Sequence, residues 1–147
     1  MYEYKCTVNK VIDGDTVDVD IDLGFGIVLT DERVRIMGID TPESRTRNKI
    51  EKLFGLAAKQ RLKELLSKQC VLKTEINKDG EDMKGKFGNF ISDNGRLVTD
   101  IMIEEGHAVA YHGQSKDDIQ DAHLKNRKKL LAEGIILQSD INKVSKK

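Results

Sequence analysis

The sequence lacks several features that would place it in a specialised class of proteins. Its 147 residues include a single proline, no tryptophan and only two cysteines. No apolar run approaches the ~20 residues that are needed to span a bilayer. The first residues, from Met1 to Cys6, have neither the basic nor the apolar region of a secretory signal. We therefore expect one cytoplasmic domain that buries a core of its own and has no membrane segment.

Cysteine and histidine are too scattered to indicate a metal or thiol site. Cys6 and Cys70 belong to no CxxC pattern. They could pair in an oxidising compartment, but two cysteines in a domain of this size are more often reduced and structural. The three histidines have no paired metal-ligand spacing, so we interpret them as surface or packing residues: His107, His112 and His123.

Net charge is also absent, since 25 acidic residues balance 25 basic ones. The simplest indication of nucleic-acid binding is therefore missing. The charges are nevertheless segregated along the chain: residues 13–22 hold five aspartates and no cation, whereas residues 45–63 hold seven lysines and arginines and one glutamate. Each segment alone is typical of a solvated face, but the basic one could also displace counterions from a nucleic acid.

The aspartate-rich segment has the alternation of a β-strand with one wet face. Val17, Val19, Ile21 and Leu23 alternate with polar residues. An EF-hand loop starting at Asp18 would need a glycine and a glutamate where the sequence has leucines, so we reject that alternative. With strands expected over 4–12 and 33–39, the pattern predicts a three-strand meander.

The rest of the chain predicts two more strands and three helices. The strands are expected over 71–76 and 87–92, with a polar loop at 78–82 and a tight turn at Asn94-Gly95. The helices are expected over 52–68, over 97–105 before Gly106, and from Ser115 to just before Gly134. The fold class is therefore α+β, mainly β: a five-stranded OB-fold barrel with three α-helices. We assign residues 1–137 to this domain and expect residues 138–147 to form a flexible polar tail.

The single proline lies in the segment whose side chains are best suited to bind a metal ion or act in catalysis, Asp40-Thr41-Pro42-Glu43. Its ring pushes Thr41 toward extended conformations and gives the Thr41 carbonyl a defined direction just after a strand. If the strand that follows Asp15 lies alongside, then Asp15 and Asp40 can offer two carboxylates to one hard cation. Oxygen donors suit Ca²⁺ or Mg²⁺, and irregular geometry favours Ca²⁺.

These residues carry a resemblance to a known family. Val11-Ile12-Asp13-Gly14-Asp15-Thr16-Val17, followed by Arg35 and Asp40-Thr41-Pro42-Glu43, resembles the staphylococcal nuclease (thermonuclease) family. Three further segments are similar to the family at corresponding places: residues 51–55, residues 86–88 and residues 106–111. The resemblance covers about residues 8 to 135, and the combined spacing of its motifs is specific.

The resemblance implies a calcium-dependent nuclease that hydrolyses phosphodiester bonds of DNA and RNA and leaves 3′-phosphate ends. Asp15 and Asp40 would bind Ca²⁺ through their carboxylates, and Thr41 through its carbonyl. Arg35 would clamp the scissile phosphate, and Glu43 would orient or deprotonate the attacking water. Tyr111 would stack on a base or contact a phosphate. The expected partner is DNA or RNA, preferably single-stranded, and the expected state is a monomer.

One departure from the family pattern affects the expected activity. Asn89 occupies the position at which the family has a second arginine, and we expect its side chain in the cleft. Asparagine offers amide donors but no charge, so the enzyme would be slow. Lys86, Lys84 or a basic residue from 45 to 49 could reach the phosphate instead. The alternative function is a catalytically weakened domain that binds nucleic acid or a protein partner.

Overall fold

The computed structural model describes residues 2–74, 86–92 and 94–145, and for Tyr2, Lys86 and Phe87 it describes the backbone alone. The loop expected over 78–82 and Lys84 lie outside these residues. Among the described helices, none is both long and apolar enough to cross a membrane.

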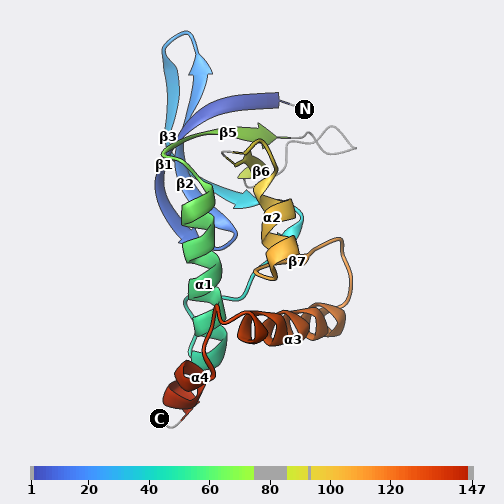
Figure 1. Ribbon diagram of the computed structural model, residues 1–147. Helices are drawn as coiled ribbons and strands as arrows, with labels where there is room; N and C mark the ends of the chain where they lie inside the picture. Colours follow the sequence, from blue (N-terminus) through green and yellow to red (C-terminus); the bar gives the residue numbers. More distant parts are fainter. Residues whose placement is uncertain (1, 75–85, 93, 146–147) are drawn as a thin grey trace.

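Five strands form a closed barrel in the order β1-β2-β3-β6-β5, which confirms the predicted fold class (Figure 1). The first three strands are the predicted antiparallel meander, and β3 and β6 are the parallel pair. Their bounds are β1 Tyr2–Asp13, β2 Thr16–Gly24, β3 Ile27–Ile36, β5 Gln69–Thr74 and β6 Lys86–Ile91.

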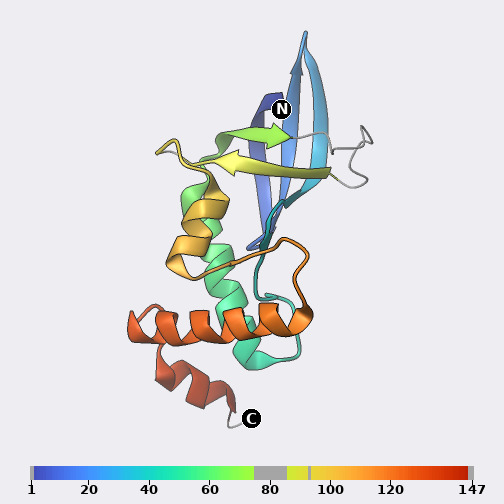
Figure 2. The ribbon, with the colours of Figure 1, turned by 90° about the vertical axis from the view of Figure 1, so that its right-hand side faces the viewer.

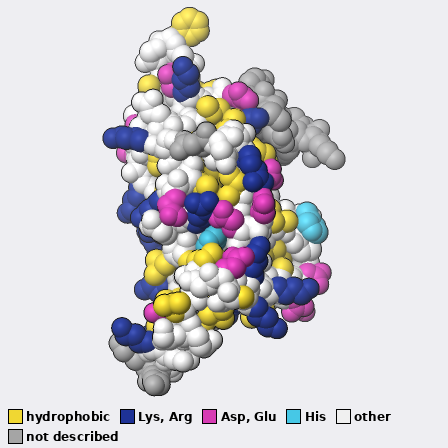
Figure 3. All heavy atoms as spheres, in the orientation of Figure 1, with side chains coloured by type: hydrophobic (Ala, Val, Ile, Leu, Met, Phe, Trp, Pro, Cys, Tyr) yellow, Lys and Arg dark blue, Asp and Glu magenta, His cyan; other side chains and the backbone are white. Residues whose placement is uncertain are grey.

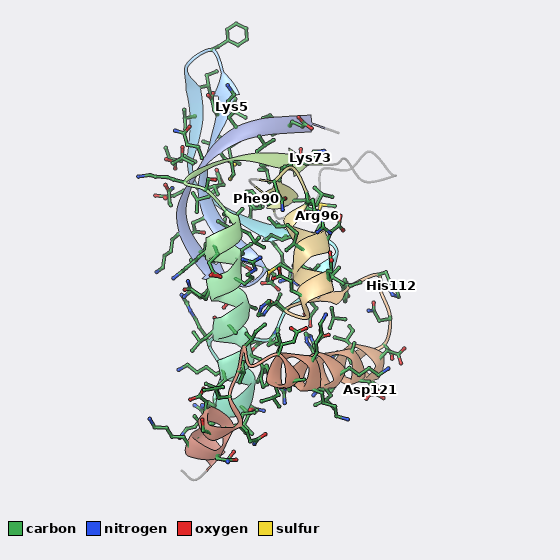
Figure 4. All side chains as sticks on the ribbon, viewed as in Figure 1. Lys5, Lys73, Phe90, Arg96, His112 and Asp121 are labelled. Carbon is green, nitrogen blue, oxygen red and sulfur yellow. The ribbon has the colours of Figure 1, made fainter. Side chains whose placement is uncertain are left out.

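The apolar side chains of the alternating pattern in β2 point into the barrel, as expected, over most of the strand. Val17, Val19 and Ile21 are buried, and Phe90 of β6 lies in the same core (Figure 4). The pattern fails at Leu23, which is 40% exposed. The tip of the β2–β3 hairpin projects past the barrel (Figure 1), and its residues 22–31 are all exposed.

The strand expected over 33–39 is divided. β3 ends at Ile36, and Gly38 adopts a positive φ of 80°, a conformation that glycine adopts without steric cost. The chain then forms β4, Ile39–Asp40, which leaves the barrel and pairs with β7, Val109–Ala110. This turn carries Asp40 away from the line of β3.

The described residues form four helices, of which α3 and α4 lie below the barrel in Figure 1: α1 Lys49–Leu65, α2 Val98–Glu105, α3 Lys116–Ala132 and α4 Gln138–Ser145. The first begins earlier than expected because the Asn48 side chain caps it by accepting from the Glu51 amide. Ser115 caps α3 in the same way, and Gly106 ends α2, both as predicted. Figure 2 shows α3 crossing below the barrel, where Leu130 packs with Phe54 of α1.

The fourth helix lies in the segment that we expected to form a flexible polar tail. Residues 138–145 are helical, and Ile141 packs against the cluster formed by Phe54, Leu130 and Ile136. The segment is polar overall, so its composition suggested a tail.

Candidate functional site

The turn at Gly14 presses the end of β1 and the start of β2 against their neighbours. A Cβ atom here would lie 2.8 Å from the Cβ atom of Ala58 and 3.3 Å from that of Thr41. A larger residue would therefore push helix α1 and Thr41 away. Because glycine occupies the turn, Asp13 and Asp15 lie close to the segment that follows Asp40.

That segment is held in place from two sides. The Ser44 hydroxyl donates a hydrogen bond to the Asp13 carboxylate, and Ser44 is 3% exposed. On the other side, a Cβ atom at Gly55 would overlap the Glu43 carbonyl and lie 2.6 Å from the Ser44 amide nitrogen. Glycine in the first turns of α1 therefore lets the helix pack directly on the backbone of residues 43–44.

These turns and strand β3 together enclose a pocket of about 300 Å³. Its lining contains every residue that we expected to bind metal or act in catalysis. In full, it consists of Asp13, Asp15, Thr16, Arg35, Asp40, Thr41, Pro42, Glu43 and Arg45. Four carboxylates and two guanidiniums thus share one small, polar space.

Arg35 and Asp15 form an ion pair across β2 and β3. The distance from Arg35 Nη1 to Asp15 Oδ2 is 2.6 Å, and the other carboxylate oxygen accepts from the Thr16 hydroxyl at 3.0 Å. The Asp15 side chain is 9% exposed, whereas that of Arg35 is 44% exposed. The guanidinium is therefore anchored at one end, while much of the side chain stays open to a ligand.

Asp40 has a partner that lies far away in the sequence. Its Oδ2 atom lies 2.7 Å from Nε2 of His123 on α3, and the histidine side chain is 9% exposed. His123 is thus a packing residue, as expected, but it also positions Asp40. This contact joins α3 to β4, and no local pattern in the sequence indicates it.

The remaining aspartates of β2 have structural partners on the outer face of the barrel. Asp18 pairs with Arg33 at 2.9 Å, and this hydrogen bond holds the pKa of the Asp18 carboxyl below its usual value. Asp20 accepts from Asn9 and from the Asp31 amide. The acidic run is therefore mostly a solvated face, and only Asp13 and Asp15 reach the pocket.

Comparison with known proteins places this geometry in a family. The family model described as "Staphylococcal nuclease homologue" matches residues 33–132. The chain belongs to this family. The matched residues include four of the pocket's expected functional positions, Arg35, Asp40, Thr41 and Glu43, whereas Asp15 lies before them.

Individual relatives agree with the family model. The chain is 33% identical over 103 residues to a thermonuclease of Staphylococcus intermedius, covering 70% of this chain and 57% of that protein. It is 29% identical over 137 residues to the SPbeta prophage-derived endonuclease YokF of Bacillus subtilis, covering 90% and 43%. A micrococcal nuclease of Shigella flexneri is 30% identical over 120 residues, covering 78% and 62%. The chain therefore spans about half the length of these relatives.

Two of the side chains that we expected to bind substrate, Asn89 and Tyr111, do not line the pocket of this staphylococcal nuclease homologue. The Asn89 amide donates to the Thr99 hydroxyl of α2 at 3.0 Å, and its oxygen accepts from the Phe90 amide. It therefore faces α2 rather than the cleft, contrary to our expectation. Tyr111 follows β7, is 52% exposed, and donates its backbone N–H to the Gly38 carbonyl. The Lys86 side chain lies outside the described residues.

One residue of the pocket was not singled out by its sequence. Arg45 is one of several basic residues in the segment 45–63, and the charge pattern gives no reason to prefer it. The structure does, because it is the one member of that segment in the pocket lining. The Pro42 turn and the buried Ser44 next to it place Arg45 there.

The pocket residues suit a hard cation in their donor chemistry. Within the described residues, no group of three or more histidine, cysteine, aspartate or glutamate side chains is placed to hold a metal ion. The expected calcium set needs two carboxylates, Asp15 and Asp40, together with the Thr41 carbonyl, and all three residues line the pocket. Such a mixture of carboxylate and carbonyl oxygens fits Ca²⁺. Arg35 and His123 would share the carboxylates with the ion.

Proposed function

We propose that the protein is a calcium-dependent nuclease that hydrolyses phosphodiester bonds in DNA and RNA and leaves 3′-phosphate ends. The observation that supports this most is the convergence of Asp15, Arg35, Asp40, Thr41 and Glu43 on one pocket from three separate segments. A calcium-binding barrel with a purely structural ion would need neither the half-exposed guanidinium nor the free carboxylate of Glu43.

The residues have distinct roles in this proposal. Asp15, Asp40 and the Thr41 carbonyl hold Ca²⁺, which when bound would neutralise charge on the phosphoryl oxygens. Arg35 donates to a non-bridging oxygen of the scissile phosphate and stabilises the charge that grows there. Its anchoring to Asp15 leaves further N–H donors for this purpose.

Glu43 is suited to act on water. It is exposed at the pocket, and within the described part of the chain its carboxylate makes no hydrogen bond or ion pair. It can therefore orient a water molecule and accept its proton as the oxygen attacks phosphorus. The bond from phosphorus to the 5′-oxygen breaks, the 3′-oxygen keeps the phosphate, and the departing 5′-oxygen takes a proton from solvent.

Substrate and assembly follow from the same proposal. Single-stranded DNA or RNA is the preferred substrate in this proposal, since an unpaired strand can bend to bring one phosphate into a pocket of about 300 Å³. The protein acts as a monomer, and residues 1–137 form the nuclease domain. Figure 3 shows cationic and anionic side chains interspersed over one face, so contacts to nucleic acid depend on local cations rather than on a uniformly basic surface.

The decisive experiment is the release of acid-soluble fragments from single-stranded DNA with Ca²⁺, with Mg²⁺ and with excess chelator. We expect release with Ca²⁺ and none with chelator. Full activity in chelator would exclude the metal dependence. Analysis of the fragment ends distinguishes 3′-phosphate from 5′-phosphate products.

A second candidate function is a domain that binds nucleic acid with little turnover. The observation that favours it is the orientation of Asn89, because strand β6 supplies no guanidinium to the pocket at this position. This alternative predicts salt-sensitive binding of single-stranded DNA together with release at background rate under all three conditions.

A further inference from the structure

Arg45 is the guanidinium of the pocket that has no partner among the described residues. It lines the pocket beside Arg35, and it is exposed. Within the described residues it makes no ion pair or side-chain hydrogen bond, whereas Arg35 is bound to Asp15 at 2.6 Å. Its guanidinium therefore keeps all its donors for a ligand.

The backbone that carries Arg45 is fixed although the side chain is not. Ser44, directly before it, is buried and donates to Asp13 at the end of β1. Helix α1 packs on the same backbone at Gly55. Arg45 therefore extends from a fixed backbone position beside the pocket. When it binds a ligand, only the conformational entropy of its side chain is lost.

The net charge of the pocket favours a second cationic side chain beside Arg35. Four carboxylates line it, from Asp13, Asp15, Asp40 and Glu43. A bound Ca²⁺ and Arg35 would together offset three of these negative charges, and a phosphodiester would bring one more. With Arg45 the pocket and the ion are formally neutral before the substrate enters, and without it they repel the phosphate.

We infer that Arg45 is the second phosphate-binding guanidinium of this pocket. It donates to a non-bridging oxygen of the scissile phosphate opposite Arg35, and this contact strengthens as charge develops during cleavage. Strand β6 does not fill this role at Asn89, whose amide is bonded to Thr99. The inference rests on the proposed nuclease function and adds to it a residue that determines the rate.

The test compares Arg45→Ala with Arg47→Ala in the full chain. Arg47 is also exposed, lies two residues away and is absent from the pocket lining, so both variants lose the same formal charge. We expect Arg45→Ala to lower kcat on single-stranded DNA with Ca²⁺ by roughly 10²- to 10³-fold relative to Arg47→Ala. Arg45→Lys should recover only part of this loss, since lysine keeps the charge without the planar fork.

Three further measurements make the outcome unambiguous. Equal thermal unfolding midpoints for the variants and the parent would show that the rates compare folded proteins. Binding of single-stranded DNA in chelator should weaken similarly in Arg45→Ala and Arg47→Ala, because ground-state attraction depends mainly on charge. The kcat of Lys86→Ala is measured as well, because Lys86 is a cation that the sequence offered as an alternative phosphate ligand.

The inference is overturned if Arg45→Ala and Arg47→Ala have the same kcat, or if Lys86→Ala shows the large loss in place of Arg45→Ala. In both cases the parent would still cleave, so the proposed function would stand. A parent that releases no fragments with Ca²⁺ would instead overturn the proposed function and this inference with it.

Discussion

At the scale of single residues, the pocket depends on partners that lie far from one another in the chain. Asp15 is held by Arg35 from the neighbouring strand, and Asp40 is held by His123, 83 residues further on. Both carboxylates are thus positioned before any ion binds. This limits the side-chain order that must be gained on binding.

Asp40→Ala should abolish both calcium binding and cleavage. It removes one of two carboxylates in the proposed calcium set, whereas the control Asp18→Ala removes an aspartate that pairs with Arg33 outside the pocket. The measurement is the rise in unfolding midpoint on adding Ca²⁺, since a ligand that binds only the folded state stabilises it. We expect the rise in the parent and in Asp18→Ala but not in Asp40→Ala. An unchanged rise in Asp40→Ala would mean that the ion binds elsewhere.

Asn89→Arg should not raise turnover, although the family pattern alone would favour a gain. The asparagine bonds to Thr99 and to the Phe90 amide, and an arginine would lose these contacts at a cost of roughly 0.5–1.5 kcal/mol each. Asn89→Ala is the control, because it loses the same bonds without adding charge. Chemical unfolding and kcat are measured together. A tenfold higher kcat in Asn89→Arg would show that the new side chain reaches the phosphate after all.

At the scale of elements, sequence patterns predicted the parts of the fold that depend on local order. The alternation in β2, the cap at Ser115 and the glycine after α2 each specify their own element. The division between β3 and β4 was missed because residues 33–39 read as one strand, and the turn depends on one glycine at position 38. Helix α4 was missed because it packs on an apolar cluster that includes residues of α1 and α3, far away in the sequence.

The same distinction applies to the candidate site. The motifs around Asp15 and Asp40 predicted which residues share the pocket, since both lie at strand ends beside tight turns. The contact of His123 and the orientation of Asn89 were not predictable, because each depends on how a helix packs against a strand. Arg45 could not be chosen from seven cations in the segment 45–63 until its neighbour Ser44 was seen to be buried.

Gly55→Ala should damage both stability and cleavage through the contact of α1 with the backbone of residues 43–44. The added Cβ atom would overlap the Glu43 carbonyl, and relieving such overpacking costs about 1–3 kcal/mol. The better helix propensity of alanine, about 1 kcal/mol, only partly offsets this. Leu56→Ala is the control, since Leu56 is 43% exposed on the same turn. A Gly55→Ala variant that is more stable and fully active would show that the loop moves without cost.

At the scale of the whole molecule, the net charge is neutral, but individual ionisable groups should make the stability of the fold depend on pH. Arg61 and Glu105 join α1 to α2 with distances of 2.6 and 2.8 Å. The hydrogen bond from Arg61 holds the pKa of the Glu105 carboxyl below its usual value. Next to this pair His107 is 4% exposed, and burial lowers the pKa of its imidazole despite the nearby Glu105 carboxylate.

Both groups should destabilise the fold as the pH falls, in two separate ranges. Below about pH 6.5 the unfolded chain protonates His107 while the folded chain does not, so stability declines until the lowered folded pKa is reached. Below about pH 4.5 the unfolded chain protonates Glu105 first, and stability declines again through the lowered folded pKa. The stabilising effect of each group is therefore complete above its unfolded pKa.

His107→Gln should remove the upper of these two declines. The matched control is His112→Gln, because His112 is exposed on the segment between β7 and α3 (Figure 4) and should leave the decline in place. The measurement is the free energy of unfolding by denaturant at several values between about pH 8 and pH 5, compared as a slope because His107→Gln also changes packing. The charged groups around His107, namely Arg61, Glu64, Glu105 and Glu133, are the same in parent and variants. If His107→Gln keeps the parent's slope, the decline does not belong to His107.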